Sequence, residues 1–187
     1  MILLKIVDNE DFNTQYDLCK QCGGKCCQRN ACDCSPKDFD NSIEKMREAL
    51  NTGNYTIDFS REDAKSFICK DGKVILDTEK VKNNPIEFFY IRPKNVNRPI
   101  VDIIHREEIE GPCIFWNKES GCPLTYKRRP MGGRTMVPFP GRNCISQYHK
   151  PIMIQEWKKF QDQLIELAKE FFDGEWIIYK EFNFSIK

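Results

Sequence analysis

The residues with the clearest chemical potential are the cysteines. Ten of the 187 residues are cysteine, and six of these fall between Cys19 and Cys34. The spacing of Cys19 and Cys22 lets two thiolates hold one ion from the ends of a tight turn. Cys26 and Cys27 then add two more soft ligands. Soft thiolates select zinc, copper(I) or iron–sulfur clusters over magnesium or calcium.

Further cysteines return from distant parts of the chain. Cys32 and Cys34 follow the opening run at once, Cys113 and Cys122 flank a turn, and Cys144 comes after a proline-rich stretch. A metal site built from distant segments contributes directly to folding, so we expect a bound metal to organise the whole domain. The spacing indicates metal binding without identifying the metal.

Composition and charge indicate the compartment. No stretch approaches the roughly 18 consecutive apolar residues of a spanning helix, and residues 1–7 are too short for a signal-peptide core. We therefore expect a cytoplasmic protein, in which dense cysteines are more often metal-binding or catalytic than disulfide-bonded. The 29 Lys and Arg residues nearly balance the 28 Asp and Glu residues, giving a net charge of +1. This balance argues against a membrane-surface protein or a general nucleic-acid binder.

The elements that must position these cysteines suggest a single α+β domain over residues 1–187. We expect short antiparallel strands and hairpins, a cysteine-rich N-terminal segment and a long C-terminal helix. Ser35 followed by Pro36 favours a helix that begins there and ends at residues 51–53. Residues 60–63 suggest another helical turn.

The middle of the chain favours strands, because it is rich in β-branched and aromatic residues bounded by proline or glycine. The expected hairpins pair 67–69 with 74–76 and 113–116 with 122–124, and single strands are expected at 86–91 and 100–104. Residues 130–140 suggest an extended loop. Apolar residues at helical spacing then predict the helix from Trp157 to Phe171, and residues 176–186 suggest a last strand.

Several of these motifs together resemble a known family. The ordered landmarks are Cys19-x-x-Cys22-Gly23-Gly24-x-Cys26-Cys27, Gly111-Pro112-Cys113-Ile-Phe, Gly121-Cys122-Pro-Leu-Thr-Tyr, and Arg129-Pro130 with Arg134. They resemble the small bacterial proteins of the CxxCxxCC or YkgJ-like family, which are described as zinc- or iron-chelating. A related cysteine cluster occurs in flagellin lysine N-methylases. The resemblance runs from Cys19 to Cys144, most of the chain.

The resemblance implies a set of metal ligands: Cys19, Cys22, Cys26, Cys27, Cys113 and Cys122, with Cys144 matching a later cysteine of the family. The chain departs from the family at one position. The family usually has a cysteine in an Arg-Pro-x-x-Cys-Arg motif, and Gly133 stands in that place before Arg134. Cys144, Cys32 and Cys34 are the candidates to replace it; alternatively, one metal keeps an open coordination position.

The identity of the metal stays open at this point. Two zinc ions need about eight ligands, whereas a [4Fe-4S] cluster takes about four cysteines. We favour an iron–sulfur cluster, with zinc as the alternative, because the resemblance includes a methylase with such a cysteine set.

The arginines of the same loop have two interpretations. Arg129 and Arg134 either tie the loop down or form an anion site for a phosphate, a carboxylate or a cofactor such as S-adenosylmethionine. Three functional classes follow. The chain is a metal or cluster carrier, an enzyme with methyl transfer as its nearest analogy, or a structural zinc module that binds a protein partner.

Overall fold

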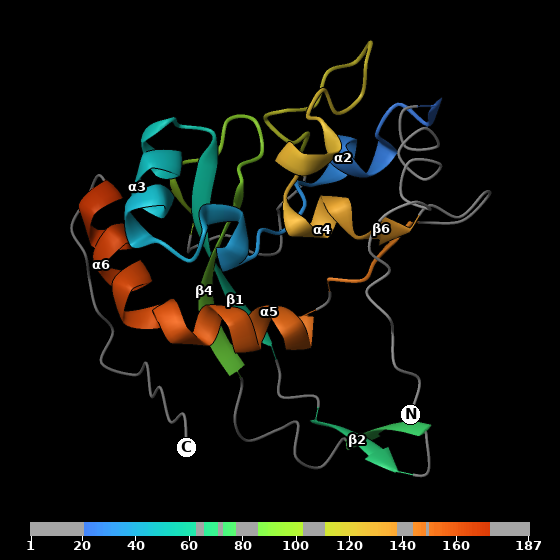
Figure 1. The fold of residues 1–187 in the computed structure, drawn as a ribbon, viewed down its shortest axis with the longest axis vertical. Helices are drawn as coiled ribbons and strands as arrows, with labels where there is room; N and C mark the ends of the chain where they lie inside the picture. The colour runs from blue at the N-terminus through green and yellow to red at the C-terminus, as the bar shows by residue number, and fades with distance from the viewer. Residues whose placement is uncertain are drawn as a thin grey trace.

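A computed structural model describes residues 21–62, 66–70, 73–77, 86–102, 111–137, 144–148 and 150–172. Helices and strands are mixed, as expected for an α+β chain, around a small three-stranded sheet. In Figure 1, α3 and α6 lie together at one side of this sheet, and α2 and α4 lie together at the other. The cysteine-rich segment is on the side of α2.

The sheet has the strand order β4-β1-β5. Strands β1 (Tyr55–Glu62) and β4 (Ile86–Pro93) pair antiparallel along their whole length, and the short β5 (Val101–Asp102) runs parallel to β1. The predicted strands at β4 and β5 are thus confirmed. The predicted helical turn at 60–63 is wrong, because Ser60 to Glu62 continue β1 and pair with β4.

Two smaller pairs of strands lie outside this sheet. The predicted first hairpin is confirmed as β2 (Ser66–Lys70) and β3 (Lys73–Asp77), which pair antiparallel with each other. The other pair joins β6 (Met136–Val137) to β7 (Ile145–Ser146).

The first predicted helix is divided in two. A 3₁₀ helix, η1 (Pro36–Phe39), begins with a capping box: the Ser35 hydroxyl accepts from Lys37 N at 3.2 Å, and Asp38 accepts from Ser35 N at 2.9 Å. Asp40 and Asn41 then take left-handed backbone angles, with φ of 52° and 56°. That conformation cannot continue a right-handed helix, so α3 (Ile43–Asn51) starts again from its own cap.

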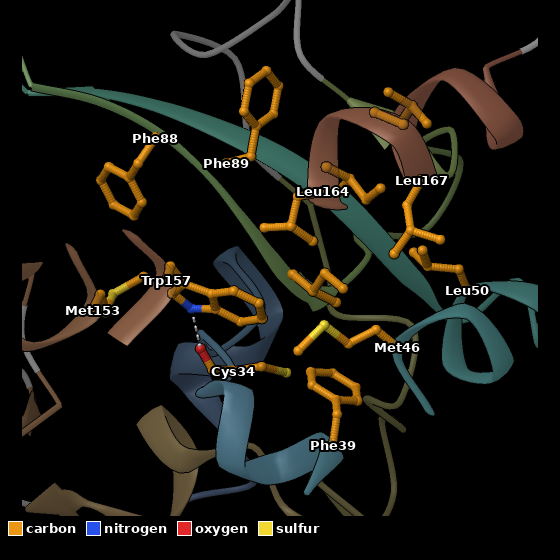
Figure 2. Close-up of a cluster of buried hydrophobic side chains, with 14 of the residues drawn as sticks. Cys34, Phe39, Met46, Leu50, Phe88, Phe89, Met153, Trp157, Leu164 and Leu167 are labelled. Atoms are coloured by element: carbon orange, nitrogen blue, oxygen red, sulfur yellow. Dashed lines mark hydrogen bonds between the residues drawn. The ribbon is translucent and has the colours of Figure 1, made fainter. Parts of the chain in front are cut away.

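The C-terminal helix is longer than predicted and is interrupted. It consists of α5 (Lys150–Trp157), the 3₁₀ segment η4 (Lys158–Phe160) and α6 (Gln161–Phe171). Its apolar residues pack on β1, β4 and α3, and Trp157 is fully buried among them (Figure 2). The indole Nε1 of Trp157 donates to the Cys34 carbonyl at 2.9 Å. This bond ties the helix to the segment that follows the cysteine run.

Two other predictions are corrected. Residues 113–116 and 122–124 form no strands; instead Asn117 and Gly121 close a turn through two backbone hydrogen bonds of 2.8 Å. The expected loop at 130–140 contains α4 (Met131–Arg134) and β6, and a short 3₁₀ helix, η3 (Tyr126–Arg128), precedes it. The predicted last strand lies outside the described residues. Within the described part of the chain, no helix has the length and apolarity to cross a membrane.

A buried ion pair crosses the centre of the sheet. Arg92 on β4 and Asp58 on β1 each expose 1% of their side chains, and the Arg92 Nε lies 2.7 Å from Asp58 Oδ2. The hydroxyl of Tyr90 donates to the same carboxylate at 3.1 Å. Each charge offsets the burial of the other, although the Nη2 of Arg92 is buried without a hydrogen-bond partner among the described residues.

We predict that Asp58→Ala lowers the free energy of unfolding by about 3–5 kcal/mol, because the guanidinium of Arg92 would remain buried without its carboxylate. Urea denaturation measures this change. Lys169→Ala is the control, since it breaks an exposed pair with Glu166 and should change stability little. Equal stability of the two variants would contradict the prediction.

Candidate metal centre

Helix α2 (Lys25–Arg29) carries Cys26 and Cys27 and begins at a pair of unusual glycines. Gly23 and Gly24 have φ of 66° and 69°, which glycine adopts without strain. A Cβ on Gly24 would lie 3.5 Å from the backbone nitrogen of Cys122. Gly24 is therefore in ordinary van der Waals contact with a distant part of the chain, which approaches the start of α2 here.

Gly121 completes this close approach. It also has a left-handed φ, of 70°, and a Cβ there would lie 3.0 Å from the carbonyl carbon of Gly23. No side chain fits at this contact without moving the backbone. The next residue is Cys122, so the packing of these glycines places its thiol near the cysteines of α2.

Hydrogen bonds hold the two segments together along their length. Cys113 N donates to the Cys27 carbonyl at 2.8 Å, and Gly111 N donates to the Arg29 carbonyl at 3.1 Å. At the other end, the indole Nε1 of Trp116 donates to the Gly23 carbonyl at 3.1 Å. Sequence reasoning missed Trp116, because nothing in the sequence places its indole beside Gly23, which is 93 residues away.

The thiols converge on Cys27. Its sulfur lies 4.0 Å from that of Cys26, and its thiol also interacts with those of Cys122 and Cys32. Cys27 and Cys113 are both buried in one small apolar cluster with Ala31. The structure thus brings five of the predicted ligands together from α2, the segment after it and residues 113–122.

The thiols in this group differ in acidity. Hydrogen bonding from the Cys27 thiol, assisted by the charge of Arg129, lowers the pKa of Cys26 to about 6. The same two neighbours lower the pKa of Cys122 to about 6. In return, Cys122, Cys26 and Cys32 raise the pKa of Cys27 far above its usual range. Burial raises the pKa of Cys113 to about 12. The thiols of Cys26 and Cys122 are therefore more acidic than those of Cys27 and Cys113.

Arg129 is the cation of this group. It is 8% exposed and directly follows η3, and its Nε donates to the Leu124 carbonyl at 3.2 Å. Its guanidinium also interacts with the Cys122 sulfur. A buried guanidinium beside sulfur atoms favours their thiolate forms.

Arg134 has a different set of partners. Its guanidinium pairs with the Asp38 carboxylate and donates to the Lys127 carbonyl at 3.3 Å. Asp38 also accepts from Met131 N at 2.8 Å, so these contacts fix α4 to η1. That Arg129 and Arg134 bind an anionic cofactor stays a prediction.

The other predicted ligands are not members of this small cluster. Cys34 is 1% exposed and belongs to the main apolar core, where burial raises its pKa (Figure 2). Cys22 is exposed, and Cys144 is half-buried just before β7. Cys19 lies outside the described residues.

Among the described residues, no three His, Cys, Asp or Glu side chains are arranged so that they could hold a metal ion as they stand. The thiols of the group are neighbours, therefore, and their side chains would have to turn toward a bound ion.

Comparison with known proteins adds no assignment. The chain matches no family model, no curated protein and no solved structure. The resemblance to the CxxCxxCC family therefore rests on the quoted motifs alone.

We predict that Gly121→Ala destabilises the protein more than Gly53→Ala does. Both glycines have left-handed φ, of 70° and 71°, so both variants bear a backbone strain of about 1–2 kcal/mol. A Cβ on Gly53 meets nothing within 4 Å, whereas one on Gly121 strikes the backbone of Gly23. Thermal unfolding of both variants measures the difference.

The same two variants should also differ in the reactivity of their thiols. The thiols of Gly121→Ala should react faster with a thiol reagent than those of Gly53→Ala, because Cys27 loses its cover. Equal unfolding temperatures and equal thiol reactivity would show that the glycine contact does not hold the cysteines together.

Proposed function

We propose that this protein binds a metal ion or an iron–sulfur cluster through the thiolates of Cys26, Cys27 and Cys122, with Cys113 beside them. The observation that carries the proposal is the packing of Cys26, Cys27, Cys113 and Cys122, from separate segments, in one small buried cluster. Thiolate sets of this kind suit zinc and iron–sulfur clusters.

The fit can be judged from the distance between two sulfurs. Tetrahedral Zn–S bonds of about 2.3 Å place two thiolates on one zinc ion about 3.8 Å apart. The sulfurs of Cys26 and Cys27 are 4.0 Å apart. A change of a few tenths of an ångström, which a side-chain rotation supplies, would therefore bring this pair to a zinc ion.

The same distance bears on the choice of cofactor. In a [4Fe-4S] cluster, four cysteines hold four irons, so two neighbouring cysteines bind separate atoms. The 4.0 Å distance between these two sulfurs therefore supports zinc, the alternative to the iron–sulfur cluster. The iron–sulfur cluster expected from the resemblance stays a prediction, with redox or methyl-transfer chemistry as the function it would supply.

The apolar surroundings also support a metal. Among the described residues, the cluster around the thiols has three buried apolar members, Cys27, Ala31 and Cys113. So small a cluster contributes little hydrophobic stabilisation. Small units of this kind are commonly stabilised by a structural metal or by disulfides, and the cysteines described here are free.

The decisive measurement is made on protein purified without oxygen. We expect an absorption spectrum with iron, zinc and acid-labile sulfide assays to give either about four iron and four sulfide per chain or zinc. Cys27→Ser and Cys122→Ser should lose this metal, because each removes a sulfur from the centre of the group. Cys144→Ser is the control and should retain it. Full retention in both test variants would refute the proposed centre.

Removal of the metal should also destabilise the fold. We predict that a chelator lowers the unfolding temperature of the wild-type protein, because metal-binding free energy contributes to folding. Calorimetry with and without the chelator measures the shift, and restoring the metal should reverse it. A metal-loaded protein whose unfolding temperature is unchanged by chelation would show that the metal does not stabilise the fold.

A further inference from the structure

Two glycines of α4 pack directly against the segment that contains Cys32. Gly132 N donates to the Asp33 carbonyl at 2.9 Å. A Cβ on Gly132 would lie only 3.0 Å from the Asp33 carbonyl oxygen and 3.1 Å from its nitrogen. Backbone therefore touches backbone here, and the position of α4 relative to Cys32 is fixed.

Gly133, the next residue, differs from Gly132 in the space around it. A Cβ on Gly133 would lie 3.5 Å from the sulfur of Cys32 and 3.6 Å from the Cβ of Arg129. Both are ordinary contact distances. Gly133 is also absent from the described glycines with positive φ, so its backbone accepts any L-residue. Position 133 can thus carry a side chain, and that side chain would begin beside the Cys32 sulfur.

Cys32 in turn belongs to the thiol group. Its thiol interacts with that of Cys27 and its charge acts on Cys113. Cys34, two residues later, is in the main apolar core instead. The charges of Cys32 and Cys113 act on Cys34 too, but of these two cysteines Cys32 is the one whose thiol interacts with that of Cys27.

We propose that Cys32 is the fourth thiolate ligand of the centre, and that residues 32 and 133 are two alternative attachment points for the same ligand. This inference rests on the proposed metal-binding function. It is carried by the position of Gly133, where an added Cβ would lie 3.5 Å from the Cys32 sulfur. The side chain of a cysteine at residue 133 would begin next to the position of the Cys32 sulfur, so its thiol could take the place of the Cys32 thiol.

The test moves the thiol from one position to the other. Cobalt(II) is titrated into full-length, metal-free protein, and the thiolate-to-cobalt absorption reports the number of bound sulfurs; competition with zinc gives the affinity. Cys32→Ser should weaken binding by at least about tenfold, since loss of even a supporting contact costs about 10- to 100-fold. The double variant C32S/G133C should recover most of that loss. Its matched control, C32S/G133S, has the same bulk without the thiol and should not.

A second measurement needs no variant. Alkylation of the wild-type protein with and without zinc, followed by mass spectrometry, should show Cys32 protected by the metal and Cys144 labelled in both samples. The two hypotheses fail differently. Wild-type protein that binds neither cobalt nor zinc, and carries no cluster, overturns the proposed function. Metal-binding wild-type protein with Cys32 labelled equally in both samples, or with C32S/G133C no better than C32S/G133S, overturns the role of Cys32.

Discussion

The buried guanidinium of Arg92 links the sheet to the cysteine-bearing segments. Its Nε donates to Asp58 at 2.7 Å and its Nη1 donates to Asn95 at 2.5 Å. The Asn95 amide donates to the Gly111 carbonyl at 2.6 Å, and Gly111 N donates to the carbonyl of Arg29 at the end of α2. A chain of polar contacts thus runs from the centre of the sheet to α2. Because a buried charge is costly to separate from its partners, this chain fixes where the cysteines lie relative to the sheet.

The two sides of the molecule are held together by different forces. On the side of α5 and α6, fifteen of the described residues form one buried apolar cluster, and Figure 2 draws most of it around Trp157. On the cysteine side, the described apolar cluster has three buried members, and the segments are held by hydrogen bonds and by the close packing of Gly121 on Gly23. Glycine contacts fix the backbone but bury few apolar atoms. A thiolate-bound metal is the kind of cross-link that such a region would need.

Sequence patterns predicted the elements whose signal is local. The hairpin of β2 and β3 and the strand β4 followed from β-branched residues and turn signals. Strand β1 was missed although Tyr55, Ile57 and Phe59 alternate with polar residues in the sequence, which is a strand pattern. Its polar side is buried as well, since Thr56 and Asp58 are almost fully inaccessible. The break after η1 was also missed, since Asp40 and Asn41 adopt left-handed angles without a glycine or proline to announce them. For the site, the spacing of the cysteines predicted that several thiols would lie together. Which cysteines these are depends on tertiary contacts that the spacing does not show.

In the proposed centre, Arg129 would offset the negative charge of the thiolates, which is a different role from binding an anionic ligand. Four thiolates around a divalent ion leave about two negative charges. Arg129 is buried beside Cys26 and Cys122 and lowers the pKa of both, so its positive charge offsets part of that excess. Electrostatic attraction is stronger in a half-buried site than in water. An anionic ligand on Arg129 would compete with the thiolates for the same cation. With Arg134 already paired to Asp38, these arginines are better suited to holding the centre and its loop than to binding a separate anion.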